Sequence, residues 1–219
     1  MATLREEAYG RITDLLNTGS LTPGLIVSQR QLVERTGSTL GAVREAVPRL
    51  EAEGLLVPLN QRGLQVPPID ATFVRNAYHL RKILEMEAIR AAPENLGMSA
   101  IAGLVRNHET ALEKIRRTPS QKLADRVQTM DWALHQGLID SLGNELISSV
   151  YRVNAIKVRM AKQARLQVTA DNAVRVLGEH LEFLIALLAG NAEEAGWHLI
   201  RHLDNSADLA LSADPALSA

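Results

Sequence analysis

Residues 38–55 read STLGAVREAVPRLEAEGL, a helical pattern that stops abruptly at a glycine. Within this stretch Val43, Val47 and Leu50 recur at the spacing of one helix face. Apolar residues at this spacing let a helix bury one side, and glycine is a common helix stop. The sequence therefore predicts a helix over residues 39–53.

On either side of this helix the sequence predicts the rest of a small domain. Upstream, apolar spacing and turn residues predict helices over residues 4–17 and 29–36. Downstream, short apolar runs at 55–59 and 64–66 flank Asn60–Gly63, whose composition is typical of a hairpin turn. Three helices and a two-stranded hairpin in this order predict a winged helix-turn-helix domain.

A different pattern begins after Val66–Asp70, VPPID, where two prolines exclude a helix interior. We place a domain boundary there, with a first domain over residues 1–69 and a second over residues 70–219. The second domain has almost continuous helical periodicity, which predicts an antiparallel bundle of about six helices and a mainly α fold. The expected helices cover residues 72–92, 99–117, 119–142, 144–166, 171–188 and 192–209.

The composition of the 219 residues excludes several classes of protein. The chain has 24 Lys and Arg against 25 Asp and Glu, and it contains no Cys. A disulfide framework, a thiolate metal site and a cysteine nucleophile are therefore excluded. The first residues lack the pattern of a signal peptide, and no apolar run reaches the roughly 18 residues of a membrane span. We expect a cytoplasmic protein that has no membrane partner.

The last helix of the predicted helix-turn-helix carries side chains where DNA contacts are expected. In this motif the N-terminal part of that helix enters the major groove. Arg44 lies one turn inside the helix, where a guanidinium reaches a phosphate or a guanine, and Thr39 either caps the helix or contacts a phosphate. With the preceding helix and the hairpin tip, the candidate DNA-binding residues are Arg30, Thr39, Leu40, Arg44, Arg62 and Gly63.

The charge of the first domain leaves a second interpretation open. Residues 1–70 contain seven basic and eight acidic side chains, which is a weak electrostatic footprint for a DNA-binding domain. Such a domain either binds a palindromic site as a dimer, or it contacts another protein.

Three histidines and one aspartate of the second domain are candidates to meet at the centre of the bundle. Asp131 and His135 are four residues apart and share a helix face, while His180 and His202 belong to later helices. One carboxylate and three imidazoles suit a divalent ion such as Zn²⁺, Ni²⁺ or Mn²⁺ and leave coordination positions open. The alternative is a hydrogen bond on the helix surface without a metal. The other histidines are expected to be solvated or partly buried: His79, His108 and His198.

Ordered motifs within residues 21–55 carry a family resemblance. In chain order they are Leu21–Gly24 (LTPG), Gln31–Val33 (QLV), Gly37, Val43–Ala46 (VREA) and Leu50–Leu55 (LEAEGL). This order resembles the amino-terminal domain of the GntR transcription factors, which implies a winged helix that binds double-stranded operator DNA. The family usually has an arginine where this chain has Leu40. Leu40 therefore either meets a thymine methyl or lowers the affinity.

The second domain carries a resemblance of its own. Asp131 with His135, Gly143-Asn144, His180 and His202-Leu203 follow one another in the order typical of the FCD ligand-binding domain of the FadR subfamily. The resemblance implies that Asp131, His135, His180 and His202 are metal ligands. It further implies effector contacts by Arg81 and Asn144. Arg81 either pairs with an effector carboxylate or forms a solvated or structural ion pair, and Asn144 either contacts the effector or is a loop cap.

Taken together, the two resemblances imply a ligand-responsive regulator of transcription, a repressor that acts as a homodimer. A small organic acid bound near the metal would release it from a palindromic operator. Two other functions stay open on the residues alone, a small metal-dependent hydrolase and a winged-helix module that binds protein. The hydrolase is disfavoured because the chain has no HExxH motif, no nucleophile elbow and no clear base. Glu179 and Glu182 are candidate bases by proximity only, and a helix points Glu179 away from the face of His180.

Overall fold

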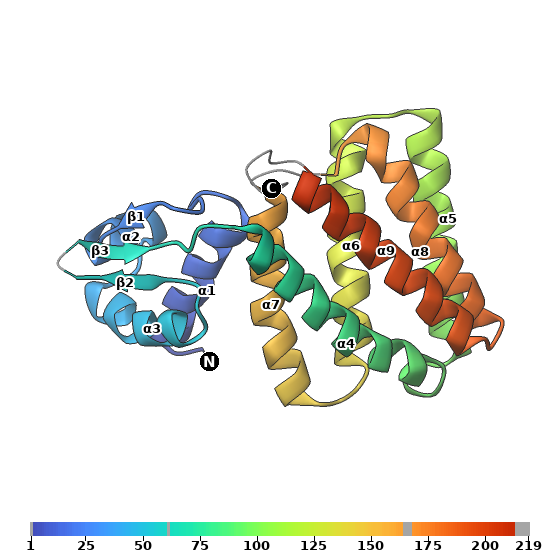
Figure 1. The fold of residues 1–219 in the computed structure, drawn as a ribbon, viewed down its shortest axis with the longest axis horizontal. Coiled ribbons are helices and arrows are strands. Elements are labelled where there is room, and N and C mark those ends of the chain that lie inside the picture. The colour runs from blue at the N-terminus through green and yellow to red at the C-terminus, as the bar shows by residue number, and fades with distance from the viewer. Residues whose placement is uncertain (1, 61, 164–167, 213–219) are drawn as a thin grey trace.

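The computed structural model describes residues 2–60, 62–163 and 168–212, which form a smaller and a larger lobe (Figure 1). The smaller lobe is the predicted winged helix-turn-helix domain. It contains α1 (Leu4–Asn17), β1 (Ile26–Val27), α2 (Gln29–Thr36), α3 (Leu40–Ala52), β2 (Val57–Leu59) and β3 (Gly63–Gln65).

The wing has three strands, so the predicted two-stranded hairpin is incomplete. β3 is the central strand and pairs antiparallel with β1 on one side and with β2 on the other. β1 has only two residues, which is too short for alternating hydrophobicity to reveal it. Gly63 is required at the start of β3, because its φ is +100° and a Cβ there would lie 2.8 Å from the carbonyl oxygen of Val27.

Local caps set the turn between α2 and α3. Ser28 accepts a hydrogen bond from the backbone N–H of Gln31, whose side chain accepts one from the backbone N–H of Ser28. Gly37, with a φ of 64°, ends α2. Thr39 then caps α3 by accepting a hydrogen bond from the N–H of Ala42 at 3.2 Å. Short-range signals therefore position the helix that is expected to read DNA.

The larger lobe is the predicted helical bundle, and this confirms the mainly α fold class. Its helices are α4 (Ala71–Asn95), α5 (Met98–Arg117), α6 (Gln121–Asp140), α7 (Glu145–Gln163), α8 (Ala170–Leu188) and α9 (Ala192–Ser212). Among the described residues, no helix has both the length and the apolar character needed to cross a membrane.

Several helix boundaries differ from the sequence prediction. α4 continues to Asn95 through Pro93, because the buried side chains of its last turns keep the helix packed on the core. α6 begins at Gln121, since Ser120 accepts a hydrogen bond from the N–H of Leu123 and so caps the helix. The expected end of the fourth bundle helix at residue 166 lies outside the described residues.

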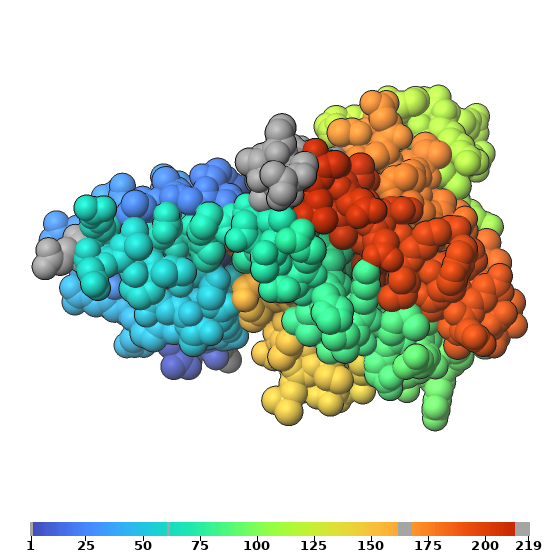
Figure 2. All heavy atoms as spheres, in the orientation of Figure 1, coloured from blue at the N-terminus to red at the C-terminus, as the bar shows by residue number. Residues whose placement is uncertain are grey.

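α7 lies between the two lobes and connects them. It packs against α4 and α6 of the bundle and against α1 of the winged domain (Figure 1). Buried apolar side chains of both lobes, such as Leu16 in α1 and Leu199 in α9, belong to one continuous core cluster. In the space-filling view the start of α4, in teal, fills the junction beside the winged domain (Figure 2). The two lobes are therefore packed together as well as covalently linked.

Candidate metal centre

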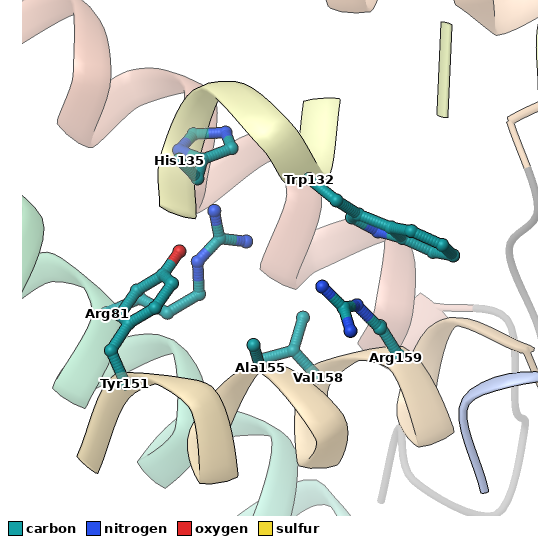
Figure 3. A pocket seen from close by; sticks show the side chains of 7 residues that line it. All are labelled: Arg81, Trp132, His135, Tyr151, Ala155, Val158 and Arg159. Carbon is teal, nitrogen blue, oxygen red and sulfur yellow. The ribbon is translucent and has the colours of Figure 1, made fainter. Parts of the chain in front are cut away.

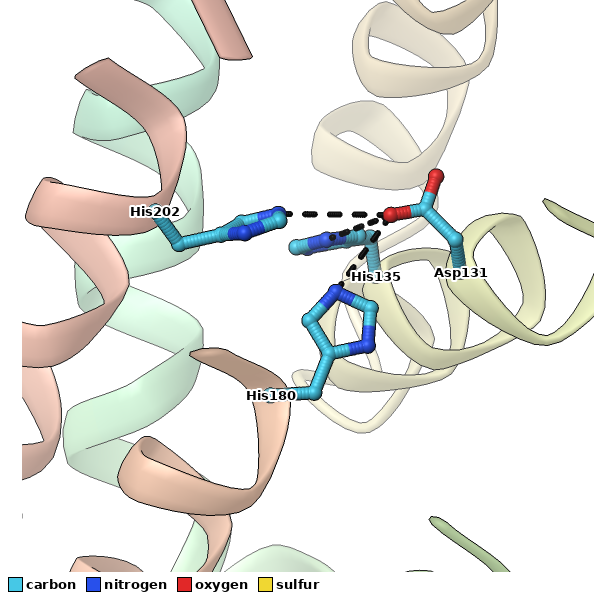
Figure 4. A group of neighbouring side chains, drawn as sticks. All are labelled: Asp131, His135, His180 and His202. Atoms are coloured by element: carbon cyan, nitrogen blue, oxygen red, sulfur yellow. Dashed lines mark ion pairs between the residues drawn. The ribbon is translucent and has the colours of Figure 1, made fainter. Parts of the chain in front are cut away.

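The structure brings the four predicted metal ligands together in the core of the bundle (Figure 4). Asp131 and His135 come from α6, His180 from α8 and His202 from α9. One ligand atom of each lies within 4.8 Å of those of the others, and each side chain is at most 2% exposed. The Nε2 atoms of His135, His180 and His202 lie 3.6, 3.3 and 3.9 Å from Oδ1 of Asp131.

The opposite nitrogen of each histidine is held by a buried partner. Nδ1 of His135 lies 2.7 Å from Oε2 of Glu85, and Nδ1 of His202 lies 2.7 Å from Oε2 of Glu179. A carboxylate accepts a hydrogen bond from Nδ1–H, which leaves the lone pair on Nε2. Such carboxylate–histidine pairs orient metal-binding imidazoles and raise their basicity.

His180 reaches the same state through a second histidine. Nδ1 of His108 lies 2.8 Å from the carbonyl oxygen of Leu104, so Nδ1 donates and Nε2 of His108 accepts. Nε2 of His108 lies 3.4 Å from Nδ1 of His180, which donates in turn. The lone pair of His180 is therefore on Nε2, toward Asp131. His108, expected to be at most partly buried, is in fact a buried supporting residue of this centre.

The donor set fits a divalent metal ion. The three Nε2 atoms are fully buried and have no hydrogen-bond partner among the described residues. Three nitrogen lone pairs and a carboxylate facing one point repel each other unless a cation or a proton lies between them. An imidazole and carboxylate set suits zinc, nickel or manganese, and four protein ligands leave positions open on an ion that takes more than four.

The pKa shifts favour neutral imidazoles at two of the three histidines. Burial lowers the pKa of His180 well below its ordinary value, and it lowers the pKa of His202 to about 4. Both rings are therefore neutral near pH 7. Burial also opposes a charge on His135, but the Glu85 carboxylate at its Nδ1 raises the net pKa of His135 above the ordinary value. Metal binding at His135 consequently competes with a proton.

A small cavity adjoins the centre and shares His135 with it (Figure 3). Two guanidinium groups reach this cavity from different helices, Arg81 from α4 and Arg159 from α7. Its wall is lined by Arg81, Trp132, His135, Tyr151, Ala155, Val158 and Arg159. A space beside the metal centre with two cationic groups is suited to an anionic ligand.

Arg81 forms the structural ion pair and also borders the cavity, while an effector contact by Arg81 stays a prediction. Its Nε donates to Oε1 of Glu85 at 2.6 Å, so it forms a structural ion pair. Tyr151 donates a second hydrogen bond to the same oxygen at 2.7 Å, and the other oxygen of Glu85 meets His135. Because Arg81 also lines the cavity, Glu85 links the cavity wall to a candidate metal ligand.

Asn144 lies apart from the cavity, at the start of α7. Its side-chain oxygen accepts hydrogen bonds from the N–H groups of Leu146 and Ile147 at 3.0 and 3.3 Å. It is not among the residues that line the cavity. These bonds correspond to the loop-cap interpretation, and an effector contact by Asn144 stays a prediction.

Sequence reasoning missed the partners that hold the ligands. Glu85 and Glu179 each pair with an arginine on their own helix, but their contacts with His135 and His202, and the contact of Tyr151 with Glu85, cross between helices and leave no signal in local spacing. Glu179 does point away from the face of His180, as the helix geometry requires, but this direction brings it to His202 on α9. His198, which shares a helix face with His202, instead pairs with the surface carboxylates of Glu182 and Glu194.

The candidate DNA-binding side chains form a separate, exposed set on the winged domain. Arg30, Arg44 and Arg62 are exposed and form no ion pair within the described part of the chain. Leu40 is 36% exposed at the start of α3. A groove beside it also includes Arg5 of α1, a residue outside the six predicted DNA contacts. Exposed guanidinium groups without an ion-pair partner in the described part of the chain, such as that of Arg44 in α3, are available to phosphates and bases.

Comparison with protein families gives two matches, one for each lobe. Residues 76–205 match the FCD domain, and residues 4–66 match the bacterial regulatory proteins of the gntR family. The first match spans the candidate metal centre and the cavity, and the second spans the helix-turn-helix and the wing.

Curated relatives and a solved structure resemble the chain over most of its length. An uncharacterized HTH-type transcriptional regulator in an unstable DNA locus of Streptomyces ambofaciens is 25% identical over 201 residues, covering 92% of this chain and 82% of the relative. The gluconate operon transcriptional repressor of Bacillus licheniformis is 22% identical over 176 residues, covering 78% and 70%. A crystal structure of a GntR transcriptional regulator from Rhodococcus sp. RHA1 has a TM-score of 0.71 at 23% identity and covers 96% of this chain and 98% of that one. The last likeness shows a shared fold.

Proposed function

Because this chain belongs to the GntR family of bacterial regulatory proteins and carries an FCD domain, we propose that it is a repressor released from its operator by a small organic acid. It is a ligand-responsive, DNA-binding regulator of transcription and not an enzyme, as the families and the regulator names of its relatives indicate. The hydrolase alternative is therefore set aside.

The observation that carries the proposal is the position of the cavity next to the candidate metal centre. Three buried Nε2 lone pairs and Asp131 converge at the centre, and His135 belongs both to it and to the cavity wall. A divalent ion held there would offer open coordination positions to a carboxylate. On this proposal the metal ligands are Asp131, His135, His180 and His202.

Arg81 would orient the effector. Its Nε is occupied by Glu85, while the side chain borders the cavity (Figure 3). A guanidinium can donate up to five N–H bonds, so pairing with Glu85 leaves donors for an effector carboxylate. The ion pair with Glu85 fixes the guanidinium before the effector arrives, which lowers the entropy cost of binding.

The winged domain would bind double-stranded operator DNA as part of a homodimer in the cytoplasm. Arg30, Arg44 and Arg62 are exposed and form no ion pair among the described residues, and Thr39 and Gly63 hold the backbone of the helix start and the wing. The even balance of acidic and basic side chains in residues 1–70 favours weak binding by one copy. Two copies on a palindrome would add their contacts, which supports the dimer.

Effector binding would weaken operator binding through a change in the position of the two winged domains. A ligand shifts such an equilibrium only by its difference in affinity for the two arrangements. The repressor direction is supported by the relative named as gluconate operon transcriptional repressor.

The first test is the metal content of untagged protein, measured by elemental mass spectrometry. We expect about one divalent ion per chain in the wild type and a large loss in His180→Ala. The exposed His79→Ala is the matched control and is expected to keep the metal. No metal in any of the three proteins would contradict the coordination part of the proposal.

The second test is operator binding to the DNA beside the protein's own gene, with and without simple carboxylates. We expect at least one carboxylate to weaken binding of the metal-loaded protein. Operator binding that no carboxylate changes, together with an empty cavity, would contradict the effector proposal. Failure to bind any such DNA would instead favour a protein-binding winged helix.

A further inference from the structure

Arg159 of α7 lies between the cavity and the winged domain. Its guanidinium lines the cavity, with Cζ 4.5 Å from the centre of the Trp132 ring (Figure 3). Its Nη1 also donates to Oδ1 of Asn17, the last residue of α1, at 3.4 Å. One side chain therefore touches both the expected effector site and the DNA-binding domain.

The bonds of Arg159 are weak compared with those of Arg81. Arg81 is paired with the carboxylate of Glu85 at 2.6 Å, whereas the one described hydrogen-bond acceptor of Arg159 is the neutral amide oxygen of Asn17. Nε of Arg159 is buried and has no hydrogen-bond partner among the residues that the structure describes. A partly buried guanidinium that has an unused donor and no carboxylate partner in the described part of the chain is poised to bind an anion.

Arg159 and Arg81 reach the cavity from opposite helices, α7 and α4. One anionic group near His135 and Arg81 leaves Arg159 without a counter-charge. A second anionic group on the same ligand would supply it. The cavity therefore favours a small dianionic acid over a monocarboxylate.

We propose that Arg159 couples the cavity to the winged domain. An anionic group of the effector binds the guanidinium of Arg159 in place of Asn17, and the loss of the Asn17 contact loosens α1. The proposal rests on the function proposed above, since it assigns to that cavity a dianionic effector and a route to DNA. Hydrogen bonds between charged groups are shorter and about twice as strong as neutral ones, so a carboxylate outcompetes the Asn17 amide. α1 packs directly on α3, which links the end of α1 to the DNA-reading helix.

Linkage makes the proposal testable from both sites. If the Asn17 contact must break when the effector binds, removing it strengthens effector binding and weakens the effect of the effector on the operator. A residue that only contacts the ligand behaves differently. Its loss weakens ligand binding, but at saturating ligand the change in operator affinity stays the same.

The experiment uses metal-loaded full-length protein with citrate, malate and succinate as probes. Trp132 fluorescence in a Trp197→Phe background reports probe binding, because Arg159 lies on the Trp132 ring. Operator affinity is measured with and without saturating probe in the wild type, Asn17→Ala and Arg159→Gln. The matched control is Arg201→Gln, with Trp197 retained, because Arg201 lies on the ring of exposed Trp197 and outside the cavity lining.

In the wild type and in Arg201→Gln we expect the best probe to lower operator affinity by about 5- to 150-fold. In Asn17→Ala we expect tighter probe binding and a smaller change in operator affinity. In Arg159→Gln we expect weaker probe binding and a change of less than about 2-fold even at saturation. The proposal would be overturned if saturating probe changed the operator affinity of Arg159→Gln as much as that of the wild type. It would also be overturned if Asn17→Ala matched the wild type both in probe affinity and in the change in operator affinity.

Failure of the proposed function is recognised separately. If no probe binds or alters operator affinity in the wild type, the carboxylate effector is wrong, and the coupling contact is then tested without ligand. Hydrogen exchange in the last turn of α1 should be faster in Arg159→Gln than in the wild type. Unchanged exchange there would overturn the role of Arg159 as well.

Discussion

The winged domain and the bundle hold their functional side chains in opposite environments. Arg30, Arg44 and Arg62 of the winged domain are exposed and unpaired within the described residues, whereas Asp131 and the clustered histidines of the bundle are at most 2% exposed. The exposed set contributes little to the core of its domain. The buried set is part of the core, so its chemistry and the stability of the bundle depend on the same contacts. Substitutions should therefore separate binding from stability in one lobe and change both in the other.

The buried ion pair of the bundle should give the largest effect. Glu85→Gln leaves Arg81 as an uncompensated buried charge, and breaking such a pair costs about 3–5 kcal/mol. Urea denaturation of the metal-free protein measures the loss. The matched control is Glu87→Gln, whose pair with Arg90 is exposed and should change stability by less than about 0.5 kcal/mol. Equal effects of the two variants would show that the environments do not differ energetically.

Metal binding should stabilise the protein through the bundle alone. A free metal concentration 100 times the dissociation constant adds about 2.7 kcal/mol to the free energy of unfolding. Thermal denaturation with Zn²⁺ and then with a chelator measures this shift and its reversal. His180→Ala should lose the shift, while Arg44→Ala should keep it in full. A metal-dependent shift that survives in His180→Ala would place the ion elsewhere.

The exposed set should affect DNA binding without affecting stability. Arg44→Ala should weaken operator binding by about 1–3 kcal/mol if Arg44 contacts a base, with stability unchanged within about 0.5 kcal/mol. Fluorescence anisotropy across a salt series separates the two contact types, since loss of a phosphate contact lowers the salt slope by about one unit.

The control on the same helix is Arg49→Ala. Arg49 pairs with Glu53 and lies on the ring of Tyr9, so it is not free to bind DNA. Its loss should leave operator affinity nearly unchanged. A loss of stability in Arg44→Ala as large as that expected for Glu85→Gln would contradict the contrast between the two lobes.

Asn144 should give the smallest effect, and it tests where the effector site ends. Asn144→Ala removes the cap of α7 and should cost about 1 kcal/mol of stability. Citrate affinity, from the Trp132 signal, should not change. Asn191→Ala removes an equivalent capping oxygen from the start of α9 and is the matched control. Weaker citrate binding in Asn144→Ala, with unchanged binding in Asn191→Ala, would show that Asn144 contacts the effector.

The sequence by itself determined the elements of the winged domain, because their signals are local. Ser28 and Thr39 cap helices within three residues of themselves, and the helix spacing of Val43, Val47 and Leu50 marks the buried face. The third strand of the wing was missed because two residues carry too little pattern. In the bundle the six helices were found for the same reason, with errors confined to their ends.

The candidate metal ligands could also be identified in the sequence, but spacing alone did not show that the four side chains meet. Asp131 and His135 share a helix turn, so their neighbourhood follows from periodicity. Their meeting with His180 and His202 rested on resemblance to the FCD domain. The structure adds the geometry, four ligand atoms within 4.8 Å.

Only the tertiary structure decided which partners support the ligands and where the cavity meets the winged domain. Glu85 lies 50 residues from His135, His108 lies 72 from His180, and Arg159 lies 142 from Asn17. Helical periodicity predicts which face of a helix is buried, but not which other helix packs against that face. That choice depends on how α4, α7, α8 and α9 pack, because long-range packing sets distances that no local spacing encodes.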